Sequence, residues 1–166
     1  MGSKTNRLGI KTAVSDREAR TLRSLATGQR VIEVGSLLGY STITLASRAT
    51  HVDAIDPHNG YPYYNPVPTL PCFLANLQRW GVDAKVTARV GLAQEWLDKL
   101  KADMAFIDCT GFYEDTKFCL NHAQAAVIAV HDFGRRGCDG VARAVIEFVR
   151  ERNRELSMID TLAIIT

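Results

Sequence analysis

The chain has 166 residues, of which 46% are hydrophobic and 23% are charged, enough to bury one hydrophobic core and too few for two. We therefore expect a single domain over residues 1–166, with no second domain for a substrate. The formal net charge of +2 gives no strong electrostatic field, which argues against a nucleic acid partner, and no run of residues approaches the roughly 20 apolar residues of a membrane span.

The N-terminal part of the chain is predicted to fold as helix, strand and helix. Ser15 and Glu18 form a capping box at the start of the first helix, and apolar residues repeat at helical spacing until Gly28 ends it. Residues 31–34 suit a buried strand. This strand leads through a turn containing two glycines into a second helix over residues 40–48.

The glycine turn after the first strand has the spacing of a cofactor-binding loop. Gly35 and Gly39 let the backbone bend tightly and approach a ligand without a Cβ in the way, although many α/β proteins use such a turn only to make the corner. Leu37 stands where a nicotinamide or flavin site has its second glycine, and the Lys-Ser/Thr of a phosphate loop is absent. An acid before the turn, Glu33, suits a cofactor with a cationic amino acid end, such as S-adenosylmethionine.

A second strand over residues 52–55 is followed by Asp56. An acid about twenty residues after the glycine turn can bind both hydroxyls of a ribose, and an ordinary helix-cap or turn acid is the alternative. His58 is expected at the surface at a helix start, and the alternative is a position lining the mouth of the site. The loop over residues 59–70 forms either a lid over a flat or sugar acceptor or a proline-stiffened connection. Its tyrosines and prolines are Tyr61, Pro62, Tyr63, Tyr64, Pro66 and Pro68.

The rest of the chain alternates between helix and strand patterns, which predicts a doubly wound α/β fold with a mostly parallel sheet. Because each motif follows a successive strand, all of them would meet at one edge of that sheet. Helices are expected over residues 71–80, 94–101, 113–123 and 140–152, and strands over residues 85–90, 102–108, 127–133 and 159–165.

Residues 31–42 resemble motif I of the class I S-adenosylmethionine-dependent methyltransferases, and closely the Glu-x-Gly-x-x-x-Gly-Tyr-Ser form of catechol-type O-methyltransferases. The His-Asp-Phe at residues 131–133, followed by residues 140–145, is similar to the macrocin-type bacterial branch of antibiotic-sugar O-methyltransferases. The resemblance runs from about Ser15 to the C-terminus. It implies a Rossmann-like fold, S-adenosylmethionine as cofactor and methylation of a small-molecule hydroxyl on a sugar, phenol or natural product.

The resemblance also bears on the last edge of the sheet. The methyltransferase fold usually closes with two strands there, one of them antiparallel, whereas the residues after the last predicted helix leave room for little more than one. We therefore expect an abbreviated C-terminal edge. An exposed edge invites a partner, and a homodimer is one way to cover it.

The resemblance further implies which residues surround the cofactor. Glu33 and the glycine turn would lie at its amino acid end, and Asp56 would bind its ribose. Residues 90–95 are similar to the family's turn beside the adenine ring. The residues expected around S-adenosylmethionine are Glu33, Gly35, Ser36, Gly39, Tyr40, Ser41, Asp56, Pro57, Gly91, Leu92, Ala93, Gln94 and Asp108.

The candidate catalytic residues, Asp108, His131 and Asp132, end the fourth and fifth predicted strands. In the catechol-type family, the resemblance would make Asp108 and Asp132 ligands of a magnesium ion that lowers the pKa of the acceptor oxygens. The third ligand would be an asparagine, but this chain has Phe133. It also lacks the lysine base of one branch and the Asp-Gly-Asp-His of the other, so magnesium is an alternative and not a requirement.

His131 is the remaining candidate for a general base. A neutral imidazole at the end of the fifth strand can take a proton from the acceptor near neutral pH, and the alternative is a histidine that only forms hydrogen bonds in the core. Because side chains alternate along a strand, His131 and Asp132 should point to opposite faces unless the chain bends between them.

The four cysteines form no Cys-x-x-Cys pair and have no histidines at metal spacing, which predicts reduced thiols in a cytoplasmic protein without a zinc site. The polar and basic N-terminus lacks the apolar core that a signal sequence has.

Two functions other than methyl transfer are also considered. One is a non-catalytic subunit or sensor that binds S-adenosylmethionine, and the other is a nicotinamide-dependent oxidoreductase, which Leu37 disfavours.

Overall fold

The computed structural model describes residues 8–60 and 67–166, and these residues contain one seven-stranded sheet. The strands are β1 (Arg30–Val34), β2 (His51–Asp56), β3 (Val86–Val90), β4 (Met104–Ile107), β5 (Val127–Val130), β6 (Leu156–Ile159) and β7 (Leu162–Ile165). They lie in the order β3-β2-β1-β4-β5-β7-β6. β1 to β5 are mutually parallel, and β7 runs antiparallel to both β5 and β6, which confirms the predicted mostly parallel sheet.

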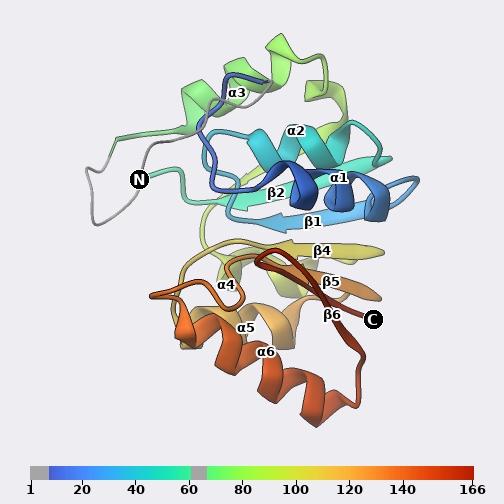
Figure 1. Ribbon diagram of the computed structural model, residues 1–166. Coiled ribbons are helices and arrows are strands. Elements are labelled where there is room, and N and C mark those ends of the chain that lie inside the picture. Colours follow the sequence, from blue (N-terminus) through green and yellow to red (C-terminus); the bar gives the residue numbers. More distant parts are fainter. Residues whose placement is uncertain (1–7, 61–66) are drawn as a thin grey trace.

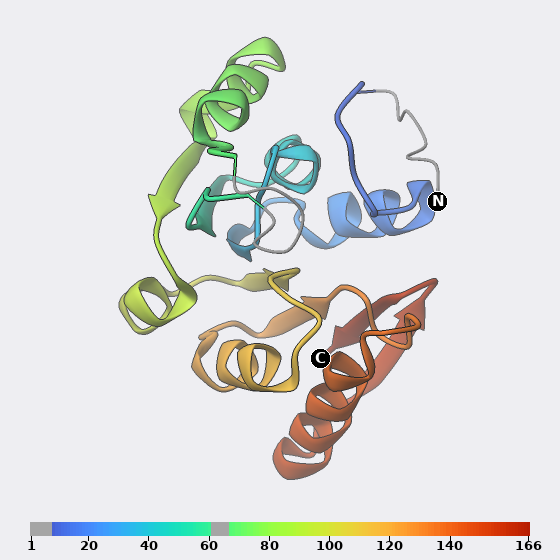
Figure 2. The same ribbon diagram turned by 90° about the vertical axis from the view of Figure 1, so that its left-hand side faces the viewer.

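Helices cover both faces of this sheet (Figures 1 and 2). The α-helices are α1 (Asp16–Leu25), α2 (Tyr40–Ala46), α3 (Leu70–Arg79), α4 (Ala93–Trp96), α5 (Tyr113–His122) and α6 (Asp139–Arg152), with short 3₁₀ helices η1 (Asp83–Lys85) and η2 (Leu97–Lys99). α1, α2 and α3 share one hydrophobic cluster with the sheet, and α5 and α6 share the other. No helix of the described ranges is long and apolar enough to cross a membrane.

The central strands are apolar on both faces because helices cover both faces. Every residue of β4 is buried, as are residues 31–34 of β1. This pattern is typical of parallel sheets, whose strands are continuous apolar runs. The capping box at the start of α1 is also confirmed: the Ser15 hydroxyl accepts from the Glu18 N–H at 3.2 Å, and Glu18 accepts from the Ser15 N–H at 2.7 Å.

The prediction of a single last strand over residues 159–165 was wrong. β6 and β7 form a hairpin in which Ile159 pairs with Leu162 across Asp160 and Thr161. Asp160 has a φ of +52°, which aspartate tolerates better than most residues, and this allows the tight reversal without a glycine. The sheet therefore ends with two strands, β7 and β6, as is usual for the methyltransferase fold. The predicted abbreviated edge is present only in the sense that each of these strands has four residues.

The fourth and fifth strands end sooner than predicted, at Ile107 and Val130. Asp108, His131 and Asp132 therefore lie in the segments just beyond the carboxyl ends of β4 and β5. The chain bends at Asp132, which has a φ of +62°. Residues 61–66, most of the predicted aromatic lid, lie outside the described residues.

Candidate functional site

The glycine turn lies tightly against the end of β4. Gly35 has a φ of +93°, and a Cβ built there would lie 2.1 Å from the main-chain oxygen of Asp108. Gly39 has a φ of +89° and immediately precedes α2. Gly35 of the sequence motif thus lies where only a residue without a Cβ allows the turn to pack against the main chain of Asp108.

Asp56 fastens this turn to the end of β2. One of its carboxylate oxygens accepts hydrogen bonds from the main-chain N–H groups of Ser36 at 2.9 Å and Leu37 at 2.8 Å, and the other accepts from the N–H of His58 at 2.7 Å. This supports the turn-acid interpretation. The ribose role is a prediction that these contacts do not test, and Asp56 lies at the carboxyl edge of the sheet, where such folds bind ligands.

Two polar atoms beside the turn are buried and have no hydrogen-bond partner in the described chain: one carboxyl oxygen of Glu33 and the hydroxyl of Ser36. The other oxygen of Glu33 accepts a hydrogen bond from the hydroxyl of Thr42. Burial raises the pKa of Glu33 to about 8, even though the hydroxyls of Ser41 and Thr42 lower it by hydrogen bonding. Such unsatisfied groups fit a ligand with a cationic, hydrogen-bonding end.

The pKa of Glu33 has a measurable consequence for stability. Folded Glu33 keeps its proton up to about pH 8, whereas in the unfolded chain it loses the proton near its usual 4.5. Its contribution to stability is therefore fully present below pH 4.5 and is lost as the pH rises through 8. We expect Glu33→Gln to remove this loss, which urea unfolding of both proteins at several pH values from 4.5 to 8.5 will detect. Parallel pH curves would contradict the assignment.

The turn predicted beside the adenine ring lies next to Asp56. The N–H of Gly91 donates to the main-chain oxygen of Asp56 at 3.1 Å, and Gly91 has a φ of +144°. Leu92, which follows, is 54% exposed. The structure thus brings this turn, the glycine turn and Asp56 to one edge of the sheet, formed by the carboxyl ends of β1, β2 and β3.

Two residues predicted to bind the cofactor differ from the others in position: Tyr40 lies away from this edge, and Pro57 lies at its surface. Tyr40 is buried and lines a hollow between α1 and α2, together with Ala19 and Ile43. Pro57 is exposed. The prediction of a surface position for His58 was wrong: its ring is buried against Phe73, with Nδ1 3.0 Å from the Thr69 hydroxyl.

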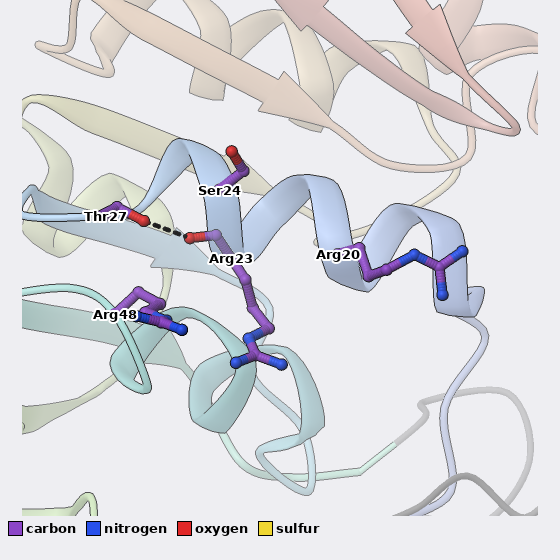
Figure 3. Close-up of a pocket in the computed structure, with 5 residues that line it drawn as sticks. All are labelled: Arg20, Arg23, Ser24, Thr27 and Arg48. Carbon is purple, nitrogen blue, oxygen red and sulfur yellow. Dashed lines mark hydrogen bonds between the residues drawn. The ribbon is translucent and has the colours of Figure 1, made fainter.

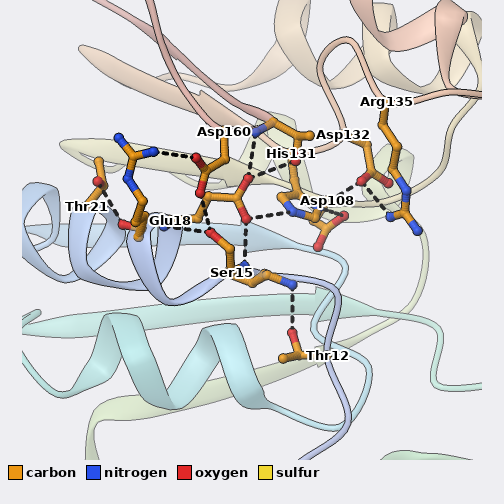
Figure 4. Close-up of polar contacts among 12 residues, drawn as sticks. Thr12, Ser15, Glu18, Thr21, Asp108, His131, Asp132, Arg135 and Asp160 are labelled. Carbon is orange, nitrogen blue, oxygen red and sulfur yellow. Dashed lines mark hydrogen bonds and ion pairs between the residues drawn. The ribbon is translucent and has the colours of Figure 1, made fainter. Parts of the chain in front are cut away.

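His131 lies at the centre of a row of ionisable groups (Figure 4). Its Nδ1 is 3.2 Å from Asp108 Oδ1 and 3.3 Å from Asp132 Oδ1, and its Nε2 is 3.4 Å from a carboxylate oxygen of Glu18. The bend at Asp132 brings both aspartates to the same ring nitrogen. His131 and Asp132 therefore do not point to opposite faces, because the strand has already ended.

These contacts determine the charge of the imidazole. Burial alone would lower the pKa of His131, but the carboxylates of Asp108, Glu18 and Asp132 outweigh burial and raise it to about 10. A protonated imidazole has no free lone pair. The geometry therefore favours the second interpretation of His131, a buried residue that forms polar contacts within the protein, over a neutral general base.

The acidic residues fit a divalent cation poorly. The ligand atoms of Asp108, His131 and Asp132 all lie within 4.8 Å of one another, close enough to share an ion. However, Arg135 donates to Asp132 Oδ1 at 2.8 Å, and the imidazolium of His131 contacts both aspartates. Two protein cations already compensate these carboxylates, and Phe133 offers no third oxygen ligand. We assign no step of the chemistry to a metal.

Sequence reasoning missed two members of this row. Glu18 was interpreted only as part of a helix cap, yet its carboxylate is buried and also accepts from the N–H and hydroxyl of Thr161, both at 2.8 Å. Arg135 was not singled out. Its only signal in the sequence is a position three residues after Asp132, which is common for surface charges.

Comparison with solved structures establishes the fold. The cofactor-bound structure of Rv0187 from MTB is 26% identical, over 98% of this chain and 83% of that one, with a TM-score of 0.75. The Bacillus cereus O-methyltransferase in complex with SAH is 18% identical, over 92% and 82%, with a TM-score of 0.73. TomG from Streptomyces achromogenes, an O-methyltransferase of tomaymycin synthesis in complex with SAM, is 19% identical, over 93% and 81%, with a TM-score of 0.67.

No protein-family model matches the chain, and no curated protein matches its sequence. The likeness to these solved structures extends over 92 to 98% of this chain. The protein has the fold of the class I S-adenosylmethionine-dependent O-methyltransferases.

Proposed function

We propose that this protein is an S-adenosylmethionine-dependent methyltransferase that methylates a hydroxyl of a small molecule. The observation that carries the proposal is the pair of buried, unpartnered atoms beside the glycine turn, one oxygen of Glu33 and the hydroxyl of Ser36. An α-ammonium group would satisfy both. Structural neighbours crystallised with SAM or SAH support the same cofactor.

The remaining cofactor contacts are proposed by position. Asp56 would bind the ribose hydroxyls, and residues 91–94 would lie against the adenine ring. Gly35, Gly39 and Ser41 would lie around the amino acid end of the cofactor, and Asp108 would lie next to Gly35, which its main chain contacts. When bound, the cofactor supplies a methyl group on a sulfonium, which an acceptor oxygen displaces in line.

We infer that Asp108 receives the acceptor's proton. Within the described chain, His131 contacts only Oδ1 of Asp108 and leaves Oδ2 without a hydrogen-bond partner, whereas Asp132 is also paired with Arg135. A carboxylate can orient the hydroxyl by accepting its hydrogen bond and can take the proton as the O–C bond forms. The imidazolium of His131 holds both aspartates in place and limits their mutual repulsion.

Calorimetric titration tests the cofactor directly. SAM and SAH, each titrated into the purified protein, are expected to bind with a Kd on the order of micromolar, about −8 kcal/mol. A nicotinamide dinucleotide should not bind, since Leu37 occupies the second glycine position and its N–H is already bonded to Asp56. Added magnesium should leave SAH binding unchanged. Absence of SAM and SAH binding would overturn the proposal.

Turnover is tested with a panel of phenols, sugars and natural products, by measuring SAH release. Product formation on a hydroxyl acceptor would support the O-methyltransferase. Binding of SAM without turnover on any acceptor would favour a non-catalytic subunit or sensor. The lost lysine and asparagine of the catechol-type pattern make this the second candidate.

Asp56→Ala is expected to weaken SAM binding by about tenfold or more, or about 1.4 kcal/mol, because it removes the ribose acceptor and the tie to the glycine turn. Asp56→Asn is the matched variant, since an amide oxygen can still accept from the N–H groups of Ser36 and Leu37. Calorimetry of both variants separates the two roles. Equal binding by wild type and Asp56→Ala would eliminate the ribose assignment.

We infer a cytoplasmic location from the reduced state of the cysteines. All four are free, and the sulfurs of Cys109 and Cys119 are 3.9 Å apart without a disulfide.

A homodimer is also proposed, with the outer edge of β6 as the contact, because Leu156 and Met158 on that strand are exposed. Sedimentation of the purified protein tests it.

A further inference from the structure

A hollow of about 350 Å³ lies between α1 and the end of α2 (Figure 3). Figure 3 shows the side chain of Arg23 extending from α1 toward α2, with Arg48 on the other side of the hollow and Arg20 farther along α1. The lining consists of three arginines and two hydroxyl residues: Arg20, Arg23, Ser24, Thr27 and Arg48.

None of the three guanidinium groups has a carboxylate partner within the described residues. By contrast, Arg17, Arg89, Arg135 and Arg143 each contact an aspartate or glutamate at 2.8 to 3.0 Å. Asp16, one helical turn before Arg20, forms no ion pair with it in the described chain. The hollow therefore concentrates positive charge that the fold itself does not neutralise.

The helix ends explain part of this arrangement. Arg23 lies in the last turn of α1 and Arg48 follows α2, where cations interact favourably with the helix dipole. The nearby main-chain acceptors are occupied: the Thr27 hydroxyl donates to the carbonyl of Arg23 at 3.0 Å, and the Gly28 N–H donates to that of Arg48 at 3.1 Å. The three guanidinium groups form no hydrogen bond within the described residues, so they can donate to an anion, and their positive charge must outweigh the partial negative charge of the two helix ends.

A second hollow of about 430 Å³ adjoins the first and shares Arg20 and Arg23 with it. Its other walls include the apolar or aromatic residues Tyr40, Ile43, Trp80 and Val82, and also the acidic residue Asp16. An anionic group held by the arginines would thus be next to a surface suited to an apolar or aromatic body.

We propose that the two hollows form a binding site for a phosphorylated small molecule, distinct from the cofactor site. The planar guanidinium groups of Arg23 and Arg48, on the two sides of the hollow, offer donors that suit a phosphate dianion, and Arg20, which extends along α1 away from them, adds positive charge nearby (Figure 3). The organic body would lie between α1, α2 and the end of α3, against Tyr40 and Trp80. The site does not depend on whether the protein is a methyltransferase.

The test is an NMR titration of the SAH-saturated protein and of the protein alone, with phenyl phosphate as the probe at constant ionic strength. Inorganic phosphate and phenol are titrated separately to represent the anion and the aromatic body. Saturable shifts are expected at the amides of residues 20–27 and 47–50. Phenyl phosphate should bind more tightly than either fragment.

The double variant Arg23→Gln, Arg48→Gln is expected to weaken phenyl phosphate binding by about tenfold. Both positions are exposed, so the fold is retained, and Arg150→Gln, which removes one exposed charge from α6, is the control and should bind as wild type. Equal affinity in the double variant, or shifts that do not saturate, would overturn the proposal. Tighter binding of a short RNA at the same residues would overturn it in favour of a nucleic acid backbone.

Discussion

Replacing Gly35 with alanine is expected to destabilise the protein by about 3 kcal/mol or more and to abolish S-adenosylmethionine binding. The φ of +93° is unfavourable for any residue with a Cβ, and the new Cβ would lie 2.1 Å from the main-chain oxygen of Asp108. Because that oxygen belongs to the end of β4, relief of the clash must move the turn or the site. Urea unfolding and calorimetric titration measure the two losses.

Gly28→Ala is the matched control for this substitution. Gly28 also has a left-handed backbone, with a φ of +73°, but no atom lies within 4 Å of a Cβ built there. The substitution should cost only the backbone strain, about 1 kcal/mol, and leave cofactor binding unchanged. Equal destabilisation by the two substitutions would show that close approach to Asp108 contributes nothing.

Replacing Glu18 with alanine is expected to destabilise the protein by about 3 to 5 kcal/mol at neutral pH. The buried carboxylate of Glu18 contacts the imidazolium of His131 and accepts two hydrogen bonds from Thr161. Alanine would remove one of the carboxylates that compensate the buried cation and leave the Thr161 N–H without its acceptor. Urea unfolding at pH 7 measures the loss.

The pH dependence separates this ion pair from a loss of packing. Burial raises the pKa of Glu18, but the facing imidazolium of His131 and hydrogen bonds from Ser15 and Thr161 outweigh burial and lower it from its usual 4.5 to about 2. The contribution of the carboxylate is therefore present above pH 4.5 and is lost as the pH falls toward 2. The stability difference between wild type and Glu18→Ala should shrink over that range.

Asp160→Asn is the control for a surface ion pair. Asp160 contacts Arg17 at 2.9 Å, but the Arg17 side chain is 65% exposed, so the loss should be about 1 kcal/mol or less. Asparagine also tolerates the positive φ at this turn. Similar losses for Glu18→Ala and Asp160→Asn would contradict a special role for the buried carboxylate.

Most helices and strands could be predicted from the sequence because their signals are local. The capping box of Ser15 and Glu18, the apolar strand before Gly35 and the glycine spacing depend on residues within a few positions of each other. The final hairpin could not be predicted, because its reversal at Asp160 uses a positive φ that no glycine marks. Its turn is bonded through Thr161 to Glu18, a partner 143 residues away in the chain.

In the candidate site, too, some features follow from local sequence signals and others depend on contacts between distant residues. The order of motifs along the chain predicts that Asp56, the Gly91 turn and Asp108 meet at one edge of the sheet, because carboxyl ends of parallel strands share an edge. The orientation of Tyr40 toward α1 depends on packing between helices, and the burial of His58 depends on contact with Thr69 and Phe73. Neither contact is encoded by spacing within a motif.

By itself, the sequence determined the fold class, the position of the glycine turn and the identity of the acids near the carboxyl ends of β1, β2, β4 and β5, because hydrophobic periodicity and glycine conformation act locally. Only the tertiary structure decided the charge of His131. That charge depends on Glu18, Asp108 and Asp132 approaching one buried ring from three different segments, and electrostatic energies depend on distance in space and on burial, not on separation in the chain.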